Sequence, residues 1–137
     1  QVNLDSLLEE SEFLSLHALL TEDTRHLMDA EHLGKMKRGS ILINTARGGI
    51  VDHDALFDVL QNGHLAAAAL DVFDPEPIPT DHQLLTLPNV IVTPHIASAS
   101  VRARDRMAVM AAENLLAGLN EQRLPFCANP QVYGKAG

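Results

Sequence analysis

The chain has 137 residues, of which 46% are hydrophobic and 20% charged, and its formal net charge at pH 7 is −8. These values are typical of a single globular domain, and they exclude a chain that is disordered throughout. The acidic balance argues against a nucleic-acid-binding surface, and no apolar run approaches the ~20 residues that a membrane helix needs. We expect no secretory signal peptide. The single cysteine, Cys127, excludes an intrachain disulfide and favours a reducing, cytoplasmic compartment.

The first half of the chain predicts alternating strands and helices. Residues 13–19 predict a strand, and Asp29 is expected to cap a short helix that ends near Met36. Residues 40–44 (SILIN) form a continuous apolar run, which predicts a strand buried on both faces. Asp52 is expected to cap the next helix, whose apolar stripe consists of Ala55, Leu56, Val59 and Leu60.

The second half predicts two more strands and a long helix. Residues 65–72 and 89–93 predict the strands, and the three prolines of residues 74–79 (DPEPIP) exclude regular structure between them. Ser98 or Ser100 is expected to cap a helix that reaches about Leu119 and buries a stripe of Val109, Met110 and Leu116. The order of elements predicts an α/β fold, in which a parallel sheet is connected by crossover helices.

Three ionisable residues follow predicted strands, namely Arg47, Glu76 and His95. The carboxyl ends of parallel strands share one edge, where ligands collect in open sheets. Arg offers a planar fork for a carboxylate, and His exchanges a proton near neutral pH, which a neighbouring Glu would orient. This trio suits the reduction of a 2-oxo acid. In the plainer interpretation, Arg47 pairs with a surface acid and His95 is an ordinary loop histidine.

Other candidates have structural interpretations. His26, His32, His53, His64 and His82 are interpreted as solvated helix-end or loop residues, and their spacing favours no metal site. The pair Gly48 and Gly49 predicts either a positive φ or a close approach of two backbones. Asp71 could merely accept hydrogen bonds within its loop.

From Phe13 onward the chain resembles the NAD-binding domain of the D-2-hydroxyacid dehydrogenase family. The matching runs are FLSLHALLTEDTRHLM, LGKMKRGSILINTARGGIVDHDAL, LAAAALDVFDPEPIP and LLTLPNVIVTPHIASAS, in unbroken order. The resemblance implies that Arg47 binds the substrate carboxylate and that Glu76 and His95 form the catalytic dyad. It also implies a cofactor, NAD or NADP, contacted by a set that overlaps the catalytic residues: Leu16, His17, Leu19, Thr45, Ala46, Arg47, Asp71 and His95.

The chain departs from the family in one large respect, because it contains no G-x-G-x-x-G phosphate loop. It therefore resembles the carboxyl-terminal half of a Rossmann-type doubly wound parallel sheet, ending in a long helix. We expect a partial dinucleotide-binding domain at residues 1–119 and a tail at 120–137, which in the family returns to a separate substrate domain. A half-sheet leaves an exposed edge, so we expect either a homo-oligomer or an incomplete polypeptide.

The subfamily is narrowed by PEPIPTDHQLLTLPNV, HIASAS and NLLAGL, which look most like glyoxylate and hydroxypyruvate reductases. The implied activity is hydride transfer between NAD(P)H and a small 2-oxo or 2-hydroxy acid. We expect the 137 residues alone to be inactive, because the phosphate loop is missing. The alternative is a non-catalytic module of the same fold, which senses the dinucleotide or binds a protein as co-repressors of the family do.

Overall fold

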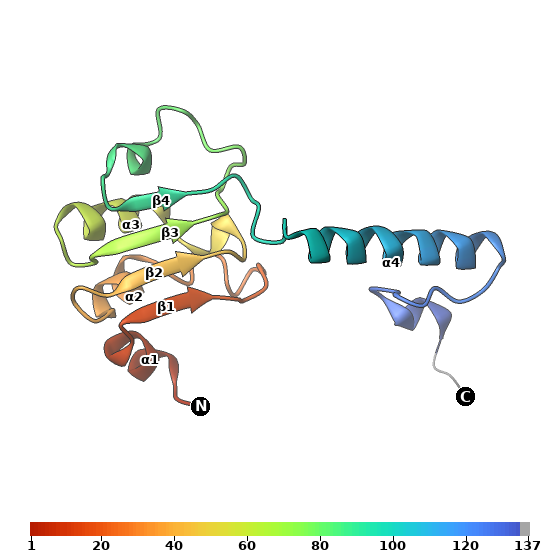
Figure 1. Ribbon diagram of the computed structural model, residues 1–137. Coiled ribbons are helices and arrows are strands. Elements are labelled where there is room, and N and C mark those ends of the chain that lie inside the picture. The colour runs from red at the N-terminus through yellow and green to blue at the C-terminus, as the bar shows by residue number, and fades with distance from the viewer. Residues whose placement is uncertain (135–137) are drawn as a thin grey trace. The chain divides into compact units, whose positions relative to one another are not determined.

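The computed structural model describes residues 1–134 (Figure 1). By its contacts the chain divides into two compact units, one from Gln1 to Ile96 and the other from Ala97 onward. The first unit contains the sheet, and the second contains the long helix α4 (Val101–Leu119). The predicted division after Leu119 stays a prediction. No helix in the described residues is long and apolar enough to cross a membrane.

The first unit is built on a four-stranded parallel sheet, which confirms the predicted α/β fold (Figure 1). Its strands follow the sequence order β1-β2-β3-β4 and are shorter than their apolar runs: Phe13–Leu16, Ile41–Asn44, Ala67–Leu70 and Val90–Val92. The last residues of the strands form one row, in which Leu16, Asn44, Leu70 and Val92 pair in turn. The segment after each strand therefore starts at the same edge.

Three helices cover one face of this sheet: α1 (Leu4–Glu10), α2 (Ala30–Lys35) and α3 (His53–Gln61). Asp29 and Asp52 cap α2 and α3 as predicted, by accepting hydrogen bonds from first-turn backbone N–H groups. The predicted stripe of α3 is buried. Helix α1 was not predicted, although Asn3 caps it and the leucines that follow could have indicated it.

The two faces of the sheet differ, and this corrects the prediction that residues 40–44 are buried on both faces. Leu42 and Asn44 point to the helix side and are buried, whereas Ile41 and Ile43 on the other face are only half-buried. On that open face Phe13 is 66% exposed and Ile91 is 67% exposed. A continuous apolar run indicates that both faces can be buried, but the helices of the first unit cover one face only.

In the second unit, Ser100 rather than Ser98 caps α4. The predicted core stripe of α4 is wrong: Val109 is 46% exposed, Leu116 is 60% exposed, and no residue of the helix is buried. The tail is described over residues 121–134. It folds back on α4, where the Asn114 side chain exchanges two hydrogen bonds with the Phe126 backbone, at 3.0 and 3.1 Å.

Candidate active site

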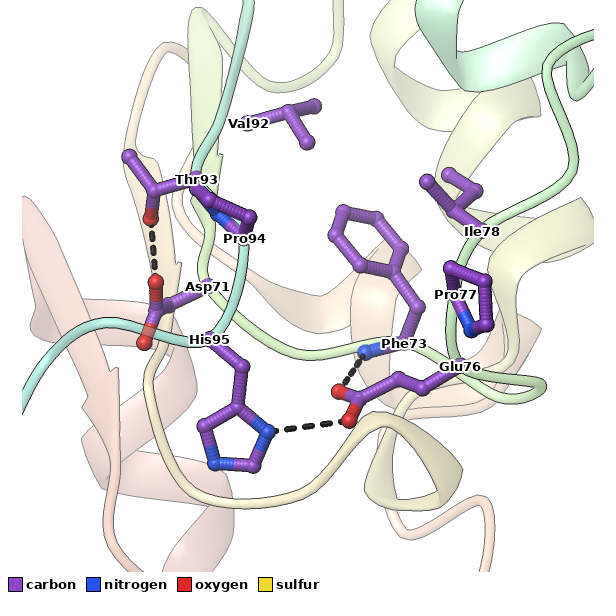
Figure 2. A pocket seen from close by; sticks show the side chains of 9 residues that line it. All are labelled: Asp71, Phe73, Glu76, Pro77, Ile78, Val92, Thr93, Pro94 and His95. Carbon is purple, nitrogen blue, oxygen red and sulfur yellow. Dashed lines mark hydrogen bonds and ion pairs between the residues drawn. The ribbon is translucent and has the colours of Figure 1, made fainter.

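The site lies where β3 and β4 end. There a cavity of about 420 Å³ opens (Figure 2). Phe73, Ile78 and Val92 form apolar parts of its wall, and Glu76 and His95 bring ionisable groups to it. The loop after β3 contributes Glu76, and the loop after β4 contributes His95. The aligned strand ends explain how residues 19 positions apart in the sequence meet.

Glu76 and His95 form the predicted dyad. Nδ1 of His95 lies 2.9 Å from Oε2 of Glu76, and the side chains of His95 and Glu76 are 48% and 37% exposed, respectively. The Phe73 backbone N–H donates to the other oxygen, Oε1, at 2.8 Å. An ionised carboxylate only accepts hydrogen bonds, so Nδ1 carries the shared proton and the opposite nitrogen, Nε2, is the one that can exchange a proton.

The electrostatics of the site favour an ionised Glu76. The hydrogen bond from His95 lowers the pKa of the Glu76 carboxyl below its usual value, and the Phe73 N–H and the charge of Arg47 act in the same direction. Because both side chains are partly exposed, solvent screens this interaction.

Arg47 is placed by the turn after β2. Its side chain is exposed, and Nη1 donates to the carbonyl of Ala46 at 2.6 Å. Among the described residues Arg47 makes no ion pair. The positive charge of Arg47 helps to lower the pKa of the Glu76 carboxyl.

Sequence reasoning missed the residue that shapes this turn, which is Asn44. It is fully buried, its Oδ1 accepts from the Ala46 N–H at 3.1 Å, and its Nδ2 donates to the Arg47 carbonyl at 2.9 Å. The signal was a polar residue at the end of an apolar strand. Such a residue needs buried partners, and here the backbone of the turn that presents Arg47 provides them.

The loop that carries Glu76 is packed tightly against the preceding turn. A Cβ atom on Gly48 would lie 1.9 Å from the carbonyl carbon of Phe73, so close backbone approach explains Gly48. A Cβ atom on Gly49 would instead meet side chains, with Oδ2 of Asp74 at 3.0 Å. Arg25 adds an ion pair to Asp74 in the same loop, at 3.1 Å. The loop has no regular secondary structure, as its prolines predict. It is nevertheless fixed by its packing against Gly48 and by the ion pair of Arg25 with Asp74.

His95 has an unusual backbone. Its φ is +53°, in the left-handed region, which costs a residue with a side chain about 1–3 kcal/mol. On both sides of it the chain is bonded to Asp71, which is 4% exposed: the Thr93 hydroxyl and the Ile96 N–H donate to Oδ1 of Asp71 (Figure 2 shows the first). Asp71 therefore accepts hydrogen bonds from the loop that follows β4, which is the structural role that the sequence left open for it.

The remaining expected cofactor residues lie at the ends of β1 and β2. His17 is exposed, with Nε2 2.9 Å from the Ser15 hydroxyl, and Leu19 is exposed beyond it. Leu16 is buried in the core, with 8% of its surface exposed. Thr45 is exposed and Ala46 half-buried. Contact with a cofactor stays a prediction for the whole set.

Two histidines, His53 and His64, differ from their prediction as solvated residues, because the Nε2 atom of each is buried. His53 packs edge-on against Phe73, with ring centroids 5.7 Å apart, and against His82, at 5.6 Å. Its Nε2 is buried without a hydrogen-bond partner in the described chain. Burial lowers the pKa of His53, and the nearby His82 lowers it further. Over residues 1–134 no group of three His, Cys, Asp or Glu could hold a metal ion.

Comparison with known proteins places the chain in a family. Residues 1–97 match the family described as D-isomer specific 2-hydroxyacid dehydrogenase, NAD binding domain, and the chain belongs to it. This confirms the resemblance and explains the half-Rossmann fold. Family membership could be inferred from the order and spacing of the matching sequence runs. The fold alone does not identify a family.

Named relatives are similar over nearly the whole chain. The chain is 50% identical to a glyoxylate reductase of Thermofilum pendens, over 95% of this chain and 38% of that protein. It is 51% identical to glyoxylate/hydroxypyruvate reductase B of Pectobacterium atrosepticum, over 95% and 41%, respectively. The crystal structure of TT0316 protein from Thermus thermophilus superposes with a TM-score of 0.87 at 52% identity, covering 90% of this chain and 40% of that one. The chain therefore spans about two fifths of the length of these relatives.

Proposed function

We propose that this chain is part of a reductase that transfers hydride between NAD(P)H and a small 2-oxo acid. The chain carries the catalytic residues of that enzyme. Glyoxylate and hydroxypyruvate are the proposed substrates, because they are named in the reductases that the chain matches. The observation that carries the proposal is the Glu76–His95 dyad at an apolar cavity, within a chain of this family.

Each residue of the trio has a distinct task in this reaction. The fork of Arg47 binds the substrate carboxylate with two parallel hydrogen bonds. His95 donates the proton on Nε2 to the carbonyl oxygen during reduction and removes it during oxidation. Glu76 holds the ring through Nδ1 and stabilises the imidazolium. The dinucleotide, when bound, supplies the hydride to the carbonyl carbon or accepts it from the alcohol.

The residues present fit the nicotinamide end of such a cofactor. The apolar wall of Phe73, Ile78 and Val92 suits a flat ring, and the proton-exchanging His95 lines the same cavity. We propose that Thr45, Ala46 and Asp71 seat that end, and that Leu16, His17 and Leu19 lie along the rest of the cofactor. The sequence has no phosphate-binding G-x-G-x-x-G loop, so we expect the 137 residues alone to bind dinucleotide poorly.

His95→Gln tests the proton transfer. Measured on the protein expressed from its complete reading frame, turnover of glyoxylate and hydroxypyruvate is expected to fall by about 10²–10⁴-fold, because general acid–base catalysis is lost. His32→Gln is the matched control, since His32 lies in α2 beside its cap Asp29. Near-normal turnover in His95→Gln would remove His95 from the proton-transfer role.

Arg47→Lys tests carboxylate binding. The substitution keeps the charge but loses the bidentate fork, so we expect KM for the 2-oxo acid to rise while KM for the dinucleotide stays close to its original value. Arg104→Lys, on the exposed side of α4, is the matched control. An unchanged KM for the 2-oxo acid would show that another group binds the carboxylate.

The non-catalytic alternative predicts a different outcome in the same assay. A protein that binds NADH and turns over no 2-oxo acid would be a dinucleotide sensor or a protein-interaction module. The complete trio favours the enzyme, because a binding module has no need for a proton-exchanging dyad. We also propose a cytoplasmic location, on the basis of the single cysteine, and self-association in the full protein; native mass measurement tests the latter.

A further inference from the structure

The catalytic candidate His95 is held in a backbone conformation that a side-chain-bearing residue rarely adopts. With φ at +53°, it lies in the left-handed region that normally favours glycine. A free loop would relax towards negative φ. Since the direction of a side chain depends on its backbone angles, relaxation would turn the imidazole away from its position 2.9 Å from Glu76.

The contacts that oppose relaxation meet at one buried oxygen. Oδ1 of Asp71 accepts from the Thr93 hydroxyl, two residues before His95, and from the Ile96 N–H, one residue after it, at 2.8 Å. One acceptor can bind both donors only while the chain between them is tightly turned. The His95 N–H closes the turn further by donating to the Thr93 carbonyl at 3.1 Å.

Asp71 is itself anchored to the sheet. Its backbone N–H donates to the Asn44 carbonyl at 2.9 Å, and the Thr93 N–H donates to the Leu70 carbonyl at 2.9 Å. Both ends of the Asp71–Thr93 link are thus fixed to strands, and the Asp71 residue is 4% exposed. The hydrogen bonds to the sheet therefore fix the position of the turn at residues 93–96.

We propose that Asp71 and Thr93 are positioning residues, which clamp His95 in the left-handed conformation that brings its imidazole to Glu76. The effect of the clamp on turnover rests on the proposed function, whereas its effect on the dyad does not. This role is separate from any contact between Asp71 and a cofactor. Thr93 distinguishes the two, because removing its hydroxyl leaves the Asp71 carboxylate in place.

Thr93→Val and Thr93→Ser form the test pair. Valine replaces the hydroxyl by a methyl group of similar size, while serine keeps the hydroxyl. In the 137-residue chain, the pKa of the Glu76 carboxyl is measured by ¹³C NMR titration, and the sign of φ at His95 is read from the intraresidue HN–Hα NOE, which is strong at positive φ. Thr86→Val is the control, because within residues 1–134 the Thr86 hydroxyl donates to the nearby Gln83 carbonyl and makes no other hydrogen bond.

The clamp predicts a rise in the pKa of Glu76 towards its usual value in Thr93→Val, because the His95 hydrogen bond is the largest cause of its lowering. The strong NOE at His95 should weaken in the same variant. Thr93→Ser and Thr86→Val should keep both signals. An unchanged Glu76 pKa and NOE in folded Thr93→Val would overturn the proposal. If the valine variant does not fold, Thr93→Ala removes the same hydroxyl and is judged by the same two signals.

Kinetics on the protein from the complete reading frame extend the test. Thr93→Val should lower kcat by about 10–10²-fold, since a displaced catalytic group loses its alignment, while KM for the dinucleotide stays within about twofold. Thr93→Ser should restore kcat. If the unsubstituted protein turns over no 2-oxo acid, the proposed function fails, and the NMR result still decides the clamp. A lost Glu76–His95 contact with unchanged kcat would instead contradict the catalytic importance of the clamp.

Discussion

Helices α3 and α4 both carry apolar residues at helical spacing, yet they end in opposite environments. In α3, Leu56 and its neighbours are buried against the sheet of the first unit. In α4, which belongs to the second unit, Leu115 and Leu116 are exposed, and no residue of the helix is buried. This difference shows that an apolar stripe predicts a helix surface whose burial would be favourable in free energy. Whether another segment of the same chain packs against that surface depends on the tertiary structure.

The largest effect is expected in α3. Leu56→Ala removes a side chain that is fully buried in the core, and we expect the free energy of unfolding to fall by about 2–5 kcal/mol. Urea denaturation of the 137-residue chain at neutral pH measures it. Asp58→Ala, on the exposed side of the same helix, is the control for helix effects. A loss well below about 1 kcal/mol for Leu56→Ala would contradict the packed core of the first unit.

A smaller effect is expected from pH, through His53 at the start of α3. Because burial lowers the pKa of His53 in the folded chain, the unfolded chain binds the proton more readily. Stability from this group is complete above the usual pKa of about 6.5, and it is lost as pH falls through that value towards the lowered folded pKa. The charged groups near the ring act in both directions, since Asp52 and Asp74 raise the pKa while His82 and His26 lower it.

His53→Phe removes the titration while keeping an aromatic ring near Phe73. We expect its stability to fall less steeply than that of the unsubstituted chain between about pH 6.5 and 5, as measured by urea midpoints at several pH values. Equal slopes would show that the burial of His53 has no energetic consequence.

The smallest effect is expected in α4. Leu116→Ala removes an exposed side chain, and exposed substitutions usually change the free energy of unfolding by no more than about 0.5 kcal/mol. The same urea experiment on the 137-residue chain compares it directly with Leu56→Ala. A loss above about 2 kcal/mol would break the comparison, because it would show that the α4 stripe is covered, by another part of the chain or by a second copy.

The predictable part of the site came from local chemistry. Arg47, Glu76 and His95 follow strands, and parallel strands place their carboxyl ends together, so their common edge could be predicted. The Glu76–His95 contact confirms it for two of the three. The family resemblance added roles that spacing could not supply. Asn44 and the Asp71–Thr93 link escaped prediction, because their importance lies in which distant backbone groups they reach.

The sequence by itself determined the order of the four strands and of helices α2, α3 and α4, the caps at Asp29 and Asp52, and the membership of a dehydrogenase family. These features depend on local propensity, on residue spacing and on long matching motifs. Only the tertiary structure decided which apolar faces are buried, that His53 lies against Phe73, and that His95 is held in a left-handed turn by Asp71. The physical reason is that burial and strain arise from contacts between segments distant in sequence. A local sequence pattern indicates that a residue needs such a contact, but it does not identify the distant segment that provides it.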